Sequence, residues 1–282
     1  MEVQKIQNME ENVFMKELAD AVNASPHNSL MVLVFGYKDS FELTAIKAAY
    51  FAYLLDINTP VLLFDWPGDQ PVSIWGYKKA QNLAKESGPY LGGTLIKISR
   101  EIKPKKLWVE ASSLGCQVVC NSFEYMVKHK DFCDPDCEID QVILSAPDVG
   151  ENEFDLQFKE EIMSLSENLT VYVSSNDEAL LMSGLIDQEK KLGRTTENET
   201  KQEQLEEMKD LLYLQSLHPG KINLVDVTPI NNASYNHGYY MEAPEFYDDF
   251  YMRVLGKDRN INRRLYLIKN KEGTDYWILR SH

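Results

Sequence analysis

The chain has 282 residues and a formal net charge of −15, from 44 acidic against 29 basic residues. This charge disfavours nucleic acids and anionic membranes as main partners, because both bind positive surfaces. Hydrophobic residues at 44% and charged residues at 26% are typical of a globular protein. No apolar run could span a bilayer and residues 1–5 do not start a signal peptide, so we expect a cytoplasmic protein, with signal-less export left open.

The first 28 residues are expected to form an N-terminal extension to the main domain. Residues 10–23 within it have the spacing of a short helix, with one face made by Phe14, Leu18 and Val22. The main domain is expected over residues 29–257.

Strand and helix patterns alternate along the main domain. Continuous apolar runs are typical of strands buried on both faces, and we expect such strands at Leu30–Val34, Thr59–Phe64, Leu107–Val109, Asp140–Ser145, Leu169–Val173 and Ile222–Val227. Helices are expected between them, at Phe41–Leu55 with Ser40 as its cap, as two helices within 75–101 separated near Gly88, and at 115–130, Phe154–Leu165, Glu178–Leu185 and 244–255. The alternation predicts an α/β fold: a mostly parallel central sheet with helices on both faces.

Two segments fall outside this alternation. A highly charged insertion covers about residues 187–219, most strongly Asp187–Asp210, and its composition favours a solvated insertion, with a mobile lid over the site as the alternative. Residues 258–282 have the pattern of a C-terminal β-hairpin. We expect this hairpin to augment or shield a sheet edge, and contact with a protein partner is a second interpretation.

The four cysteines occur as two pairs with a three-residue gap. Cys116 and Cys120 lie one helical turn apart, whereas Cys133 and Cys137 flank a loop. Zinc is disfavoured because no pair of histidines accompanies them. Buried small residues are expected for the first pair and a loop thiol pair or labile disulfide for the second, and we expect no metal.

A strand that turns sharply into a helix at Ser113 has the layout of a nucleophile elbow, small-x-Ser-x-Gly. The residues at 111 and 115 are small, and a bulky side chain at either position would collide with neighbouring backbone. A helix that starts just after the serine also directs free N–H groups toward the serine oxygen, where an oxyanion would form. A plain strand-to-helix turn is the alternative interpretation.

A nucleophilic serine needs a base, and the base needs an acceptor that holds its tautomer. Of five histidines, only His237 lies in a loop directly after a core strand, at the carboxyl-end edge where sites form in parallel sheets. Asp177 follows another buried strand, and Ser113, Asp177, His237 is the chain order of an α/β-hydrolase triad. Asp148 at the end of the preceding strand is the competing acid.

The remaining parts of the expected site come from the loop after the first strand and from the elbow itself. The Leu114 N–H is the first expected oxyanion donor, and the second is expected from the loop containing Gly36 and Tyr37. Phe35, Trp66 and Ser112 are expected to line the substrate pocket. Ordinary packing is the alternative for Tyr37 and Trp66.

These segments together resemble a bacterial α/β-hydrolase family catalogued as a domain of unknown function (number nine hundred). The similarity covers roughly residues 30–255 and is carried by short motifs: Phe35-Gly36-Tyr37-Lys38, Trp66-Pro67, Ala111-Ser112-Ser113-Leu114-Gly115, Ala146-Pro147-Asp148, Tyr172 through Asp177 to Leu180, Leu192-Gly193-Arg194 and His237-Gly238-Tyr239-Tyr240. The chain departs from the family pattern where Phe35 and Ser112 replace histidines and Lys38 replaces an asparagine. The resemblance implies an α/β-hydrolase fold and hydrolase chemistry at the matching triad positions.

The sequence therefore predicts a serine hydrolase of the esterase or lipase kind. Its substrate is expected to be a small-molecule or lipid acyl compound, cleaved through an acyl-enzyme on Ser113 with no cofactor. An acyltransferase with the same triad is one alternative. A weakly active or inactive scaffold that binds a partner is another. A cysteine enzyme is disfavoured, because Cys116 falls inside the helix after the elbow.

Overall fold

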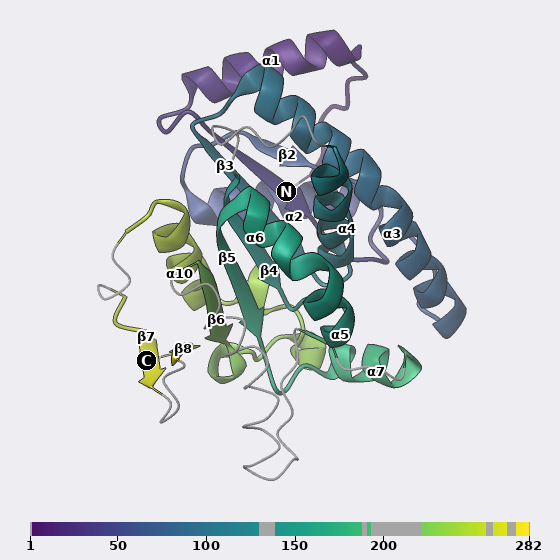
Figure 1. Cartoon of the computed structure of the whole chain (residues 1–282), viewed down its shortest axis with the longest axis vertical. Coiled ribbons are helices and arrows are strands. Elements are labelled where there is room, and N and C mark those ends of the chain that lie inside the picture. The colour runs from purple at the N-terminus through teal and green to yellow at the C-terminus, as the bar shows by residue number, and fades with distance from the viewer. Residues whose placement is uncertain are drawn as a thin grey trace.

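A central β-sheet runs through the computed structural model, which describes residues 2–129, 139–187, 191–192, 221–257, 262–269 and 275–281. The strand order across the sheet is β2-β1-β3-β4-β5-β6-β8-β7 (Figure 1). Neighbouring strands pair in parallel except β7 and β8, which form an antiparallel hairpin. The strand bounds are β1 Ser29–Val34, β2 Val61–Leu63, β3 Lys106–Ser112, β4 Ile139–Ser145, β5 Ser166–Val173, β6 Ile222–Asp226, β7 Leu265–Lys269 and β8 Asp275–Leu279. The predicted mostly parallel sheet is confirmed.

Burial along the strands follows their position in the sheet. Every residue of β1 is buried, as its apolar run predicts, because helices cover both faces of a parallel sheet. β2 lies at the sheet edge and its three residues are only partly buried. The predicted strand at Thr59–Phe64 is therefore present but shorter and less buried than its sequence indicates.

Helices pack on both faces of the sheet (Figure 1). One core cluster joins the sheet to side chains of α1, α3, α4 and α6, and the other joins it to α2, α9 and α10. Ser40 caps α2 by accepting a hydrogen bond from the Leu43 N–H, as predicted. The α-helices are α1 Glu11–Ala24, α2 Phe41–Leu55, α3 Ile74–Lys97, α4 Gly115–Lys128, α5 Glu151–Glu153, α6 Lys159–Leu165, α7 Glu178–Asp187, α9 Tyr239–Glu242 and α10 Pro244–Val254. The described residues also include two π-helical turns, η1 Ile98–Ile102 and η4 Phe154–Phe158, and two 3-10 turns, η5 Thr228–Ile230 and η6 Ser234–Asn236.

The prediction of two helices within 75–101 is wrong, because α3 is continuous through Pro89. The packing of Gly88 against α4 explains why the helix continues although Pro89 favours a break. A Cβ atom at position 88 would lie 2.4 Å from the Cβ of Asn121 on α4, so the two helix backbones approach closely. Pro89 and Lys85, whose carbonyl loses its helical donor, are both exposed, so water can solvate the group that the proline leaves unpaired.

Helix α1 forms as predicted but with a different buried face. Met15, Leu18 and Val22 are its buried residues, whereas Phe14 is 37% exposed. Of the face predicted from Phe14, Leu18 and Val22, the last two residues are buried, and Met15 takes the place of Phe14. The correct face follows the i, i+3, i+7 spacing from Met15, which keeps all three side chains on one side of the helix.

The C-terminal hairpin extends the sheet, as predicted. β8 pairs in parallel with β6, and β7 is the outermost strand. In the part of the chain that the structure describes, no helix has the length and apolar character needed to cross a membrane. The predicted charged insertion lies outside the described residues except for Asp187, Lys191 and Leu192.

Candidate active site

Ser113 occupies a strained turn between β3 and α4. Its backbone is left-handed, with φ of 54°, a conformation that non-glycine residues rarely adopt. Small neighbours make this turn feasible: a Cβ atom at Gly115 would lie 2.3 Å from the carbonyl oxygen of Val34 and 2.7 Å from that of Phe35. Ala111 is fully buried. The expected crowding around positions 111 and 115 is present, and the turn holds the serine at the carboxyl end of the sheet.

Backbone hydrogen bonds fix the elbow to the neighbouring strand. The Ser113 N–H donates to the carbonyl oxygen of Ser145 at 2.9 Å. The Asp148 N–H donates to the carbonyl oxygen of Ser113 at 3.1 Å. Both peptide groups of the serine are therefore tied to the end of β4.

Ser113, His237 and Asp177, which are distant in sequence, form a continuous chain of hydrogen bonds. The Oγ of Ser113 lies 2.8 Å from Nε2 of His237, and Nδ1 of the same ring lies 2.7 Å from Oδ2 of Asp177. Parallel topology explains this meeting, because the ends of β3, β5 and β6 lie at one edge of the sheet. Such a geometry lets the imidazole take a proton from the serine while the carboxylate holds its tautomer.

Asp177 has a second structural task at the start of α7. It is fully buried, and its Oδ1 accepts a hydrogen bond from the Leu180 N–H at 2.9 Å, so it caps the helix while it holds His237. The competing acid, Asp148, contacts Tyr77 and Ser183 through its carboxylate. The structure thus places Asp177, and not Asp148, against the imidazole.

The loop after β1 approaches the serine as closely as backbone can. A Cβ atom at Gly36 would lie 2.9 Å from the Cβ of Ser113 and 3.2 Å from its Oγ. Within the described residues, the N–H groups of Leu114 and Tyr37 donate no backbone hydrogen bond. These two groups are therefore free to donate toward an oxygen beside Ser113.

The three residues expected to line the pocket are almost fully buried. Phe35 is 3% exposed, Trp66 6% and Ser112 1%. Trp66 has a visible supporting contact, because its indole N–H donates to the carbonyl oxygen of Phe35 at 2.8 Å. It braces the loop that carries Gly36, and a pocket-lining role for the three residues stays a prediction.

Sequence reasoning left Tyr239 and Tyr240 without a role in the site. The Tyr239 hydroxyl accepts a hydrogen bond from the Ala146 N–H at 2.7 Å and donates to the carbonyl oxygen of Tyr172 at 3.1 Å. The ring of Tyr240 packs edge-on against His237, with 6.2 Å between ring centroids. Their positions two and three residues after His237 were the available signal in the sequence.

Cysteine chemistry finds no support at the described positions. Cys116 and Cys120 are free and buried, and burial raises the pKa of both thiols, which keeps them protonated. Cys133 and Cys137 lie outside the described residues. Among the residues that are described, no group of three His, Cys, Asp or Glu side chains is arranged to hold a metal ion.

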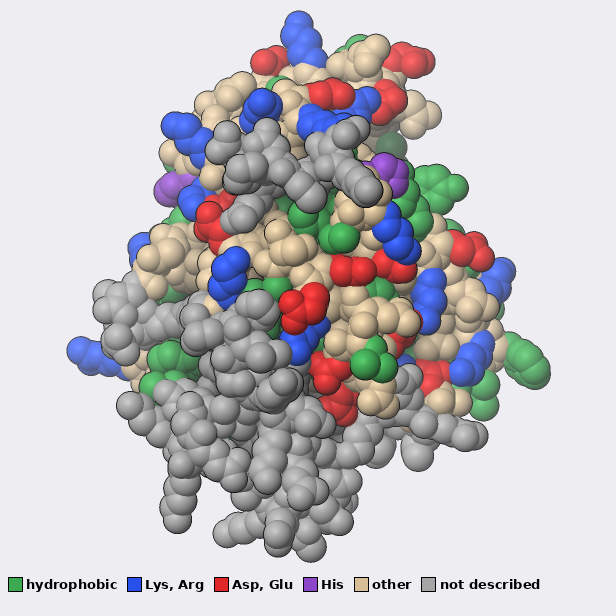
Figure 2. Space-filling model, in the orientation of Figure 1, with side chains coloured by type: hydrophobic (Ala, Val, Ile, Leu, Met, Phe, Trp, Pro, Cys, Tyr) green, Lys and Arg blue, Asp and Glu red, His purple; other side chains and the backbone are tan. Residues whose placement is uncertain are grey.

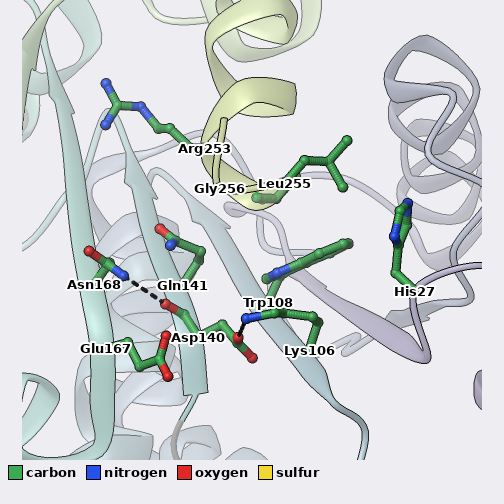
Figure 3. Close-up of a pocket in the computed structure, with 11 residues that line it drawn as sticks. His27, Lys106, Trp108, Asp140, Gln141, Glu167, Asn168, Arg253, Leu255 and Gly256 are labelled. Atoms are coloured by element: carbon green, nitrogen blue, oxygen red, sulfur yellow. Dashed lines mark hydrogen bonds and ion pairs between the residues drawn. The ribbon is translucent and has the colours of Figure 1, made fainter. Parts of the chain in front are cut away.

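A cleft of about 270 Å³ lies at the amino-terminal ends of the strands (Figure 3). It is formed by the first residues of β3, β4 and β5 and the end of α10, and Lys106 and Asp140 pair across its floor. Because Ser113, Asp177 and His237 follow the carboxyl ends of strands of the same parallel sheet, the cleft is separate from the candidate site.

The view in Figure 2 shows acidic and basic side chains interspersed over the visible surface.

Comparisons with known proteins found distant structural similarities. Similar solved structures include an uncharacterised protein from Bacillus cereus ATCC 10987, with 15% identity, a TM-score of 0.44 and coverage of 90% of this chain and 63% of that one. The Pyrococcus furiosus esterase Pf2001 has 12% identity, a TM-score of 0.47 and coverage of 83% and 84%. Aspergillus fumigatus lipase B has 15% identity, a TM-score of 0.33 and coverage of 61% and 44%. The chain thus spans less than two thirds of the Bacillus protein, and no curated protein matches it.

A family model matches far more of the chain than any single motif does. Its description is an alpha/beta hydrolase of unknown function (DUF900), and the match extends over residues 10–258. This span includes α1, the elbow, Asp177 and His237. The chain therefore belongs to the DUF900 family of α/β hydrolases.

Proposed function

We propose that this α/β hydrolase is a serine hydrolase that cleaves an ester, lipid or related acyl substrate. The observation that carries the proposal is the hydrogen-bonded chain from Ser113 through His237 to Asp177, with distances of 2.8 and 2.7 Å. Its serine lies at a strained elbow. Folding alone does not require these three polar groups at three separate strand ends. A buried carboxylate and a left-handed serine both cost stability, and such costs concentrate at functional sites.

The proposed reaction uses the side chains in fixed roles. The Ser113 oxygen attacks the acyl carbonyl carbon while its proton moves to Nε2 of His237, and Asp177 stabilises the imidazolium through Nδ1–H. The carbonyl oxygen becomes an oxyanion and accepts hydrogen bonds from the N–H groups of Leu114 and Tyr37. When the tetrahedral intermediate collapses, His237 returns the proton to the leaving alcohol.

The second half of the reaction releases the acyl group. Water attacks the acyl-enzyme and gives its proton to His237, the intermediate collapses, and Ser113 recovers a proton as the acid departs. An alcohol or amine in place of water would transfer the acyl group. All protons move between Ser113, His237, water and the leaving group, so the cycle balances with these groups alone.

Labelling with a fluorophosphonate probe tests the proposal. We expect the native protein to be labelled at Ser113, and the Ser113→Ala and His237→Ala variants to lose about a thousandfold or more of their labelling rate. Ser164→Ala is a matched control, because the Ser164 hydroxyl is bound to the carbonyl oxygen of Glu161 on α6, outside the site. Hydrolysis of p-nitrophenyl esters of increasing chain length would then define the acyl group.

The same experiment separates the proposal from a scaffold role. A folded native protein that is neither labelled nor active on any ester would contradict the hydrolase assignment. If labelled protein gives ester or amide products only when an acceptor alcohol or amine is added, the activity is acyl transfer.

A further inference from the structure

A buried cluster of ionised and polar groups lies beside the elbow and takes no part in the proposed proton transfers. The side chain of Lys191 is 3% exposed and lies between two carboxylates, 3.3 Å from Oδ1 of Asp148 and 2.6 Å from Oδ2 of Asp187. The Tyr77 hydroxyl lies 3.1 Å from both carboxylates. We name the Asp148 cluster by its members: Tyr77, Gln81, Asp148, Ser183, Asp187 and Lys191.

The charges within the cluster compensate one another. Burial alone would lower the pKa of Lys191, but the carboxylates of Asp148 and Asp187 raise it, so the ammonium stays charged. Burial would likewise raise the pKa of Asp187, but hydrogen bonds from Lys191 and Lys78 hold it below its usual range. Buried charges persist only when they are paired in this way.

Asp148 connects this cluster to the nucleophile through its own backbone. Its N–H donates to the carbonyl oxygen of Ser113 at 3.1 Å, while its carboxylate is held by the cluster. Asp148 is therefore bound to the strained serine through its backbone and to the cluster through its side chain.

The same carboxylate reaches the helix that begins beside the triad acid. Oδ1 of Asp148 accepts a hydrogen bond from Ser183 at 3.1 Å, and Ser183 lies on α7, whose first turn is capped by Asp177. Asp187, near the end of α7, is held to α3 by Gln81 at 2.6 Å. Helix α7 is thus bound to Asp148 through Ser183 and to α3 through its last residue.

A third connection leads to the expected oxyanion loop. Tyr77, which binds Asp148 through its hydroxyl, packs edge-on against Tyr37, with 5.8 Å between ring centroids. Three separate parts of the site therefore meet at Asp148. Its N–H binds the serine backbone, and its carboxylate binds Ser183 on the helix of the triad acid and Tyr77, which packs against the loop of the second N–H donor.

We infer that Asp148, with Lys191 as its buried counter-charge, is a positioning residue that aligns Ser113, Asp177 and the Tyr37 loop for the reaction. The expected change in rate rests on the proposed function. The alignment itself can also be measured without substrate, by the proton NMR signal described below. Small misplacements of reacting groups lower the rate strongly without a matching loss of binding.

The test compares Asp148→Asn, Lys191→Met and Lys191→Arg with the native chain. Lys85→Met is the matched control, since the exposed Lys85 forms an ion pair with Glu153 and is not a member of the cluster. We expect Asp148→Asn and Lys191→Met to lower kcat for ester hydrolysis about tenfold or more with KM nearly unchanged. Lys191→Arg, which keeps the charge, should recover most of this loss.

A spectroscopic readout makes the test independent of turnover. The proton between Nδ1 of His237 and Asp177 should give a far-downfield proton NMR signal, identified by its absence in His237→Ala. We expect this signal to broaden or shift in Asp148→Asn and to stay unchanged in Lys85→Met. Lys191→Met supplies the same comparison if Asp148→Asn does not fold.

The outcomes distinguish the two proposals. Folded variants with native kcat and an unchanged NMR signal would overturn the positioning role. If the native protein shows no esterase activity or probe labelling, but the signal changes in Asp148→Asn and is preserved in Lys191→Arg, the alignment role holds and the hydrolase assignment fails. A loss of kcat that Lys191→Arg does not recover would contradict the role of the counter-charge.

Discussion

Gly36 illustrates how one missing side chain can shape the site. A Cβ atom there would lie 2.9 Å from the Cβ of Ser113, closer than real Cβ atoms approach, so either the serine or the loop must shift. We expect Gly36→Ala to lower the fluorophosphonate labelling rate about tenfold or more, with about 1–3 kcal/mol of lost stability. Gly93→Ala is the control, because nothing lies within 4 Å of a Cβ at that position. Native labelling in Gly36→Ala would show that the close approach is unimportant.

Glu110 is a buried acid three positions before the nucleophile. It is 1% exposed, and in the described part of the chain neither carboxyl oxygen has a hydrogen-bond partner. Burial raises its pKa well above the ordinary 4.5, although the nearby Ser145 hydroxyl and Ala111 N–H act in the opposite direction. The folded protein therefore holds this proton to a higher pH than the unfolded chain does.

The sign of the resulting pH dependence follows from proton binding. Above the ordinary pKa the folded state binds more protons than the unfolded state, so Glu110 lowers stability as pH rises, until pH passes the folded pKa. We expect Glu110→Gln, which stays neutral, to be increasingly more stable than the native chain from about pH 5 upward, by up to about 1.4 kcal/mol per pH unit. Urea unfolding of both proteins at several pH values measures this difference. A difference that does not grow with pH would mean that Glu110 is already ionised.

The contact between α3 and α4 determines whether a proline-containing helix remains continuous. A Cβ at Gly88 would lie 2.4 Å from the Cβ of Asn121 and 2.8 Å from its carbonyl carbon. We expect Gly88→Ala to destabilise the protein by about 1–3 kcal/mol, although alanine favours helices. Gly93→Ala in the same helix should instead stabilise it by about 0.4–1 kcal/mol. Thermal unfolding measures both changes, and equal effects at the two positions would argue against close packing.

The sequence was most informative where one physical constraint dominated. Strands buried on both faces must be apolar throughout, so β1, β3, β4, β5 and β6 could be predicted from their runs. The meeting of Ser113, Asp177 and His237 followed from parallel topology, because all three come after core strands. Sequence also predicted the C-terminal hairpin, but not its pairing with β6, since the choice of edge depends on the assembled sheet.

Features that depend on contacts between distant segments could not be predicted. Pro89 and Gly88 favour a helix break locally, and only the approach of Asn121 explains the continuous helix. The sequence position of Asp148, at the end of a core strand, made it a plausible triad acid. Its actual partners come from α3, α7 and Lys191, which are distant in sequence. Phe14 and Met15 both fit a helical stripe, and the surface that α1 meets decides between them.

The order of strands in the sheet has a consequence for synthesis in the cell. A growing chain acquires Ser113 and its elbow early, but His237 follows β6, and β6 pairs with β8 near the end of the sequence. A ribosome-bound chain without these strands therefore has a serine with no base beside it. Under the proposed function, we therefore expect Ser113 to stay unreactive until the C-terminal strands have emerged, so that a half-made chain does not act on acyl groups around the ribosome.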